Sequence, residues 1–191
     1  MKRALLIALA LIATLAFVAL GVWQVERRAW KLDLIARVEA GTRAVPVAVP
    51  GPGQWPGFDA SASEYRRVVT SGSFLHDRET RVQALTVRGA GFWVLTPLRT
   101  PQGILLVNRG FVPAERRDPA SRAGGQVAGP VTVTGLLRAS EPKGGFLRSN
   151  DPADDRRYSR DVPAIAPARG GGPAAPFFVD LNDYKAEIAA K

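Results

Sequence analysis

An uncharged apolar run near the N-terminus limits what this chain can fold into more than any other feature. Residues 4–22 (ALLIALALIATLAFVALGV) contain no charged side chain. At about 1.5 Å per residue, a helix of this length spans roughly 28 Å, which is close to the thickness of the hydrocarbon core of a bilayer. We therefore predict a transmembrane segment or an uncleaved signal anchor.

A cleaved signal peptide is the alternative interpretation of this run. Such a peptide has a basic start, a shorter apolar core and a small-x-small cleavage site at its end. Lys2 and Arg3 fit the basic start, but the only clear Ala-x-Ala triplet, at residues 8–10, lies in the middle of the run. Retention is therefore favoured. Basic residues on both flanks leave the orientation open.

The helix is predicted to continue beyond the apolar run. Trp30, Leu34 and Val38 recur at i, i+4 and i+8, with charged residues on the other faces, as in an amphipathic helix at the lipid headgroups. Residues 1–37 carry six basic and two acidic side chains, and an anionic lipid surface explains this excess. Because no basic cluster is interleaved with aromatic residues, we expect the bilayer and not a nucleic acid as a partner.

The rest of the chain is predicted to be mainly β, because short segments rich in Val, Thr and aromatic residues alternate with Gly and Pro. These segments are residues 65–74, 79–87, 92–98, 104–112, 131–139 and 177–181. Most intervals are too short for crossover helices, so the strands are expected to be antiparallel, with a short helix near residues 161–168.

The predicted fold is thus an N-terminal transmembrane α-helix followed by one antiparallel β-sheet or barrel-like domain with a few short helices. Residues 1–40 form the anchor helix with its amphipathic extension, and residues 41–64 form a linker rich in Pro and Gly. Residues 65–191 form the β domain. Trp55 and Phe58, in the linker, must be buried somewhere or contact a partner.

The composition excludes several chemistries. The chain has no cysteine and one histidine, which excludes disulfides, thiolate nucleophiles and sites made of several histidines. We predict no metal site. His76 lies beside carboxylates at a predicted turn, but no nucleophile is identifiable to partner it. We therefore expect no catalytic residues, and a hydrolase is the last of the functions considered.

The segment Asn108-Arg109-Gly110 interrupts an otherwise apolar strand. Such polar residues cost stability unless they are satisfied or face a functional surface. From local physics we predict a β-bulge, with Arg109 paired to a carboxylate.

Several ordered blocks of the sequence resemble the Surfeit-locus-one family of cytochrome c oxidase assembly factors. They run from Gly21 to Asp180 and include Trp23-Gln24, Tyr65-Arg66-Arg67-Val68, Gly72-x-Phe74-x-His76-x-x-Glu79, Gly91-Phe92-Trp93-Val94-Leu95-Thr96-Pro97-Leu98, Val107-Asn108-Arg109-Gly110-Phe111-Val112-Pro113, Gly135-Leu136-Leu137-Arg138, Arg160-Asp161 and Pro176-Phe177-Phe178-Val179-Asp180. The Asn-Arg-Gly-Phe-Val-Pro block is the most specific of them.

The resemblance implies an assembly factor of the bacterial inner membrane, with its β domain in the periplasm. It implies help with haem a delivery or with maturation of the oxidase's catalytic subunit. That subunit and the haem a synthesis machinery would be the partners, and haem a a transiently bound cofactor. The alternative function is a membrane-tethered β domain that binds a lipid or a small solute.

The resemblance also suggests candidate site residues. Trp23, Gln24, Arg27 and Lys31 are expected at the membrane interface, where a cofactor or the oxidase subunit docks, although plain lipid anchoring explains them equally well. Arg27 and Lys31, one helical turn apart, would pair with haem propionates. The residues assigned to partner or structural motifs are Tyr65, Arg66, Gly72, Phe74, Glu79, Asn108, Arg109, Gly110, Pro113, Asp161, Phe178 and Asp180.

One departure from the family affects haem binding. Family members usually carry a second transmembrane helix, preceded by the histidine favoured as haem ligand, and the sequence to Lys191 has no second apolar run. The sequence is thus expected to be a fragment or a shortened family member that lacks the usual ligand region. His76 is then the remaining candidate ligand, although we interpret it rather as part of the fold or of a partner surface.

Overall fold

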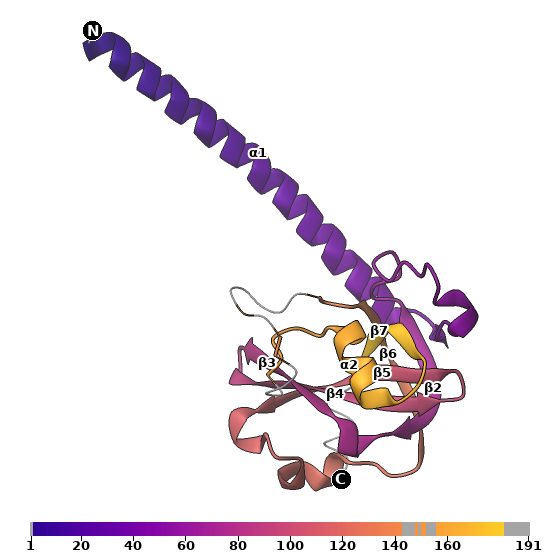
Figure 1. Cartoon of the computed structure of the whole chain (residues 1–191). Coiled ribbons are helices and arrows are strands. Elements are labelled where there is room, and N and C mark those ends of the chain that lie inside the picture. The colour runs from indigo at the N-terminus through magenta and orange to yellow at the C-terminus, as the bar shows by residue number, and fades with distance from the viewer. Residues whose placement is uncertain (1, 143–147, 149, 152–155, 182–191) are drawn as a thin grey trace. The chain divides into compact units, whose positions relative to one another are not determined.

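The protein consists of two compact units, Met1–Ala40 and Gly41–Lys191. The computed structural model describes residues 2–142, 148, 150–151 and 156–181. Figure 1 shows a single long helix in the first unit and a domain of strands with short helices in the second.

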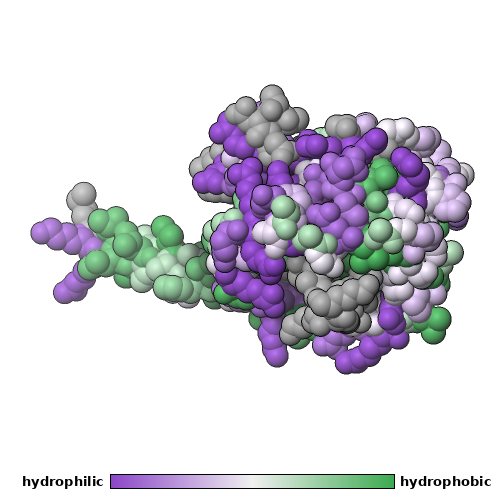
Figure 2. Space-filling model, turned by 90° about the horizontal axis from the view of Figure 1, so that it is seen from below, coloured by the Kyte–Doolittle hydropathy of each residue, from purple (hydrophilic) through white to green (hydrophobic). Residues whose placement is uncertain are grey.

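Helix α1 (Lys2–Arg43) contains the whole apolar run and its charged extension. It is long and apolar enough to cross a membrane by length and composition. Its apolar side chains are exposed on all faces within this chain, as in a helix whose solvent is lipid. Figure 2 shows them as a continuous green surface that ends in hydrophilic residues. The first unit is thus a candidate membrane span.

Helix α1 ends at Arg43, three residues after the predicted end of the anchor helix at residue 40 and past Gly41. A side chain at Gly41 would lie 1.9 Å from the backbone oxygen of Tyr65. The glycine therefore permits a close approach of two backbone segments instead of ending the helix.

The second unit is a seven-stranded sheet in the order β1-β2-β6-β7-β5-β4-β3. Its strands are β1 (Val47–Ala48), β2 (Arg67–Phe74), β3 (Thr80–Thr86), β4 (Gly89–Thr100), β5 (Gly103–Pro113), β6 (Pro130–Ala139) and β7 (Ala174–Leu181). The end of β2 also pairs with β4, at Phe74 and Leu98, so the sheet curls into a barrel-like arrangement. The predicted fold class is confirmed, and each predicted strand lies within a few residues of an observed one.

Two strand pairs are parallel, whereas the sequence predicts antiparallel strands. Strand β1 pairs with β2, and β5 pairs with β7. Strand β1 lies in the segment predicted as a linker, and residues 49–66 between it and β2 are long enough for a parallel connection. The strands of the other pair do not follow one another in the chain, so the argument from short intervals does not apply to them. Strands β5 and β7 are separated by β6, by helix α2 (Val162–Gly170) and by the 3-10 helices η3 (Ala114–Arg116) and η4 (Pro119–Gly125), and this length of chain allows a parallel crossover.

The sheet has a hydrophobic core on each of its two faces. The inner core fills the barrel, and its fully buried members come from five strands, among them Val68, Leu98, Val107, Leu137 and Phe177. The outer core lies on the opposite face, because residues adjacent in a strand point to opposite sides. It contains Leu95, Leu106 and Phe178 from the strands and Val162 and Ile165 from α2, which packs on β7, β5 and β4.

The Pro- and Gly-rich segment of residues 41–64 packs against the inner core. Trp55 and Phe58 are partly buried there, and the ring of Phe58 lies 5.0 Å from that of Phe177. The indole Nε1 of Trp55 donates to the carbonyl oxygen of Pro50 at 2.9 Å. Two residues of the segment also form β1. The segment predicted as a linker thus covers one opening of the barrel.

Helix α2 agrees with the short helix predicted near residues 161–168. The Asp161 carboxylate accepts a hydrogen bond from the backbone nitrogen of Ala164 at 3.3 Å, as an N-cap residue does. Gly171, with φ of +70°, ends the helix.

We expect Gly72→Ala to destabilise the domain by about 1–3 kcal/mol. A Cβ atom at Gly72 would lie 2.4 Å from the carbonyl oxygen of Arg99, in a backbone contact that cannot give way cheaply. Gly53→Ala is the matched control, because a Cβ there has no atom within 4 Å, and it should change stability by less than about 0.5 kcal/mol. Denaturant unfolding of the full chain in detergent, followed by near-UV circular dichroism, measures both. Equal losses in the two variants would contradict the close-approach argument.

Candidate functional site

The predicted β-bulge lies in β5. Phe111 pairs with Trp93 of β4, and Asn108 pairs with Leu95. Between these two pairs, β5 advances by three residues and β4 by two. Gly110 has φ of +110°, a conformation that favours glycine, and its backbone nitrogen donates to Oδ1 of Asn108 at 3.0 Å. The predicted bulge is therefore confirmed, and Gly110 is its conformational requirement. The carboxylate partner predicted for Arg109 stays a prediction.

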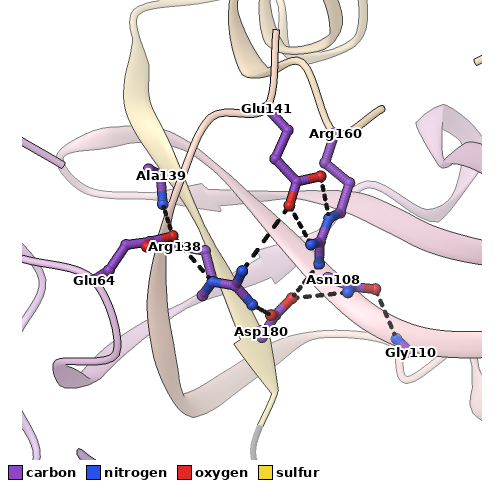
Figure 3. A network of polar contacts seen from close by, with 8 residues as sticks. All are labelled: Glu64, Asn108, Gly110, Arg138, Ala139, Glu141, Arg160 and Asp180. Carbon is purple, nitrogen blue, oxygen red and sulfur yellow. Dashed lines mark hydrogen bonds and ion pairs between the residues drawn. The ribbon is translucent and has the colours of Figure 1, made fainter. Parts of the chain in front are cut away.

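Asn108 belongs to a polar network on the outer face of the sheet, shown in Figure 3. We call it the Asp180 network; its side chains are Glu64, Asn108, Arg138, Glu141, Arg160 and Asp180. The Asp180 carboxylate accepts hydrogen bonds from Asn108 Nδ2 at 2.8 Å and from Arg138 Nη1 at 2.8 Å. It also accepts one from Arg160 Nη1 at 3.3 Å. One carboxylate thus holds β5, β6 and the segment before α2 together.

Two further carboxylates complete the network. Glu141 accepts from Nε of Arg160 at 2.9 Å, with a second contact to Nη2, and Glu64 accepts from Nε of Arg138 at 3.3 Å. The guanidinium of Arg138 also lies 4.9 Å from the ring centre of Tyr65, and that of Arg160 lies 4.8 Å from the ring centre of Phe178. Both arginines are therefore held by carboxylates and an aromatic face.

The pKa of Arg138 reflects these contacts. Burial alone would lower it, but the charges of Asp180, Tyr65 and Glu64 and the hydrogen bond to Glu64 outweigh burial and hold the pKa above its ordinary value. The arginine therefore stays charged, and the network acts as a fixed set of ion pairs that orients strands.

Arg109 belongs to a second cluster, on the inner face of the sheet. We call it the His76 cluster; its side chains are Phe74, His76, Glu79, Arg109 and Arg122. The guanidinium of Arg109 lies 5.2 Å from the ring centre of Phe74, and its Nη1 lies 3.3 Å from Nδ1 of His76. Its Nη2 contacts the carbonyl oxygen of Gly125. The blocks that contain His76 and Arg109 therefore meet in space.

The rest of this cluster attaches the chain after β5 to the barrel. His76, in η2 (His76–Arg78), contacts the carbonyl oxygen of Val127 through Nε2 at 2.9 Å. The buried carboxylate of Glu79 accepts from both Nη atoms of Arg122 in η4, at 3.0 Å for Nη1. Such a bidentate arginine–carboxylate pair fixes both position and orientation.

The four candidate residues of the first unit lie on α1. The guanidinium of Arg27 stacks over the ring of Trp23 with 5.1 Å between its carbon and the ring centre. Lys31 follows one turn later on the same face, whereas Gln24 is rotated by about 100° from Trp23. This face presents an aromatic ring and two cations, and within the described part of the chain neither cation forms an ion pair with a carboxylate.

The other candidate residues have structural positions. Tyr65 and Phe178 lie under the arginines of the Asp180 network. Arg66 is exposed, and its carbonyl oxygen accepts from Leu137 at 2.9 Å. Pro113 pairs with Gly91 at the end of β5 and precedes η3. Asp161 caps α2.

Several cluster members were missed by the sequence analysis as site residues: Glu64, Arg122, Arg138, Glu141 and Arg160. Arg138 and Arg160 lie within blocks that carry the family resemblance, and the resemblance could have identified them as candidates. Glu64 and Glu141 lie in polar loops and Arg122 lies in η4, where a sequence offers no sign of which charges will pair.

Comparison with known proteins gives a consistent result. The model of the SURF1 family matches residues 11–190. Surfeit locus protein 1 of Homo sapiens is 37% identical over 192 residues, which cover 91% of this chain and 61% of the human protein. The SURF1-like protein of Monosiga brevicollis is 37% identical over 177 residues, covering 85% and 65%, and that of Drosophila melanogaster is 32% identical over 190 residues, covering 90% and 60%. The chain thus spans about three fifths of the length of these relatives.

We expect Asp180→Asn to destabilise the domain by about 1–3 kcal/mol, because it leaves two partly buried arginines without their shared carboxylate. The control is Asp77→Asn, since Asp77 is 77% exposed in its ion pair with Arg78, and this change should cost less than about 0.5 kcal/mol. Denaturant unfolding of the full chain in detergent measures both. If Asp180→Asn were as harmless as Asp77→Asn, the network would not hold the strands.

Proposed function

This chain belongs to the SURF1 family, and from this membership we propose that it is a membrane-anchored assembly factor for cytochrome c oxidase. In this role it helps to deliver haem a to the oxidase or to mature its catalytic subunit. The observation that carries the proposal is the extent of the match, which takes in most of the apolar helix and both polar clusters. The catalytic subunit and the haem a synthesis machinery are the proposed partners.

The proposed location is the bacterial inner membrane. In this arrangement α1 crosses the bilayer and the β domain works in the periplasm. The apolar length of α1 supports the span, and the basic residues that follow the apolar run within α1 suit anionic headgroups. The domain itself has mostly hydrophilic side chains on the face shown in Figure 2, which suits an aqueous compartment.

His76 does not fit the role of an axial haem ligand. A ligating imidazole must offer one ring nitrogen to the iron. Both nitrogens of His76 are in contact with protein groups, Nε2 with Val127 and Nδ1 with Arg109. We therefore propose no part for His76 in binding haem.

The α1 face with Trp23, Arg27 and Lys31 fits the proposed docking better. Haem carries two propionates, which cationic side chains recognise, and Arg27 and Lys31 are exposed one turn apart. Gln24, about 100° from Trp23 around the helix, lies at the edge of this face. We propose that this face orients the cofactor or the catalytic subunit at the membrane interface.

Deletion of the gene in its native host tests the assembly role. We expect the deletant to lose oxidase activity and the haem a absorbance of its membranes, and the wild-type chain to restore both. Normal haem a content and activity in a deletant without a second copy of the gene would contradict the proposal.

Replacement of single cations on α1 tests the docking face. In the complemented deletant, we expect Arg27→Gln to lower haem a absorbance and oxidase activity, because it removes one cation from the face. Arg28→Gln is the matched control, since this neighbouring cation is rotated by about 100° on the helix. Immunoblots should show equal amounts of both variants. Equal activity of the two variants would contradict the docking face while leaving the assembly role intact.

A further inference from the structure

The chain after β5, residues 114–127, is attached to the barrel by three side chains of the His76 cluster. Near its middle, Arg122 is clamped by Glu79. At its end, Arg109 contacts the carbonyl oxygen of Gly125, and His76 contacts that of Val127. The two attachments differ in chemistry, because the first is an ion pair and the second depends on an imidazole.

The neighbours of His76 determine its protonation. The Val127 carbonyl oxygen can only accept a hydrogen bond, so Nε2 of His76 must carry a hydrogen. The guanidinium of Arg109 can only donate, so Nδ1 must act as the acceptor at 3.3 Å. The contacts therefore require the neutral tautomer with its hydrogen on Nε2.

The charges around His76 are of both signs. Arg109, from β5, faces the ring and opposes a positive charge there, whereas Asp77 and Glu79 favour one. Glu79 is paired with Arg122 and lies within 3.8 Å of Arg81, which reduces its influence. Burial is the largest effect; together with Arg109 it outweighs the Val127 hydrogen bond and the two carboxylates, so the pKa of His76 lies below its ordinary value of 6.5.

We propose that His76 is a pH-sensitive latch: when neutral it accepts from Arg109 and lets Arg109 hold Gly125 against the barrel, and when protonated it displaces Arg109 and releases residues 123–126, while Nε2 keeps its contact with Val127. A proton on Nδ1 removes the acceptor for Arg109 and places two cations side by side. Arg109 must then move, and its contact with Gly125 is lost. Residues 116–122 stay attached, because Arg122 is held by the carboxylate of Glu79 and not by the imidazole.

The direction of the pH dependence follows from the lowered pKa. The open segment binds a proton more readily than the latched one, so acid favours opening. The latched state is fully stabilised above about pH 6.5 and loses stability as the pH falls through the pKa of the latched form. The opening equilibrium should shift by about tenfold for every pKa unit between the two forms.

Because the chain has a single histidine, its titration can be followed without assignment. NMR of the full chain in detergent, labelled at histidine, should give a pKa below 6.5 for the wild type. Arg109→Gln should raise that pKa, because the facing charge is removed. A pKa at or above 6.5 in the wild type, or one that Arg109→Gln leaves unchanged, would overturn the proposal.

Hydrogen exchange measures the opening itself. Protection factors of residues 123–126, corrected for the intrinsic effect of pH, should fall between about pH 7.5 and about pH 5.0, while those of residues 116–122 stay constant. In His76→Gln the side chain keeps a donor for Val127 but cannot titrate, and protection should not change with pH. Constant protection of residues 123–126 in the wild type, or an equal fall in His76→Gln, would overturn the latch.

Discussion

The bulge at Asn108-Arg109-Gly110 is the constraint on which the rest of the domain depends. Adjacent residues of a strand point to opposite faces, so Asn108 reaches the outer face and Arg109 the inner one. The extra residue of the bulge then determines to which face of the sheet Phe111 and Val112 point. Without it, every residue after Arg109 would exchange faces, because a shift of one residue inverts the pattern of a strand.

Each side of the bulge supports one of the two cores. Asn108 fixes Asp180, and this carboxylate aligns Arg138 and Arg160 at the edge of the outer core. Arg109 stacks on Phe74, which packs against the inner core. The polar clusters thus provide partners for the charged side chains that lie at the edges of the hydrophobic cores. Their value is to specify which strands are neighbours, since ion pairs that lose a partner are costly.

The structure also changes the interpretation of the histidine. Among the candidate cofactor residues, His76 lies in the domain, and both of its ring nitrogens contact protein groups. Trp23, Arg27 and Lys31 lie on α1 and are exposed. The positions of these residues separate two kinds of role. The domain residues hold the fold together, and the helix residues remain available to a partner.

The sequence by itself determined the class of the protein. The uncharged length of residues 4–22 indicates a candidate membrane span. The alternation of β-branched and polar residues indicates strands, and both patterns depend on neighbouring residues alone. The bulge was predictable for the same reason. Only the tertiary structure decided that β5 runs parallel to β7, that Trp55 covers the barrel, and that Arg122 pairs with Glu79. These contacts join residues far apart in the chain, and no local pattern specifies which buried charges will meet.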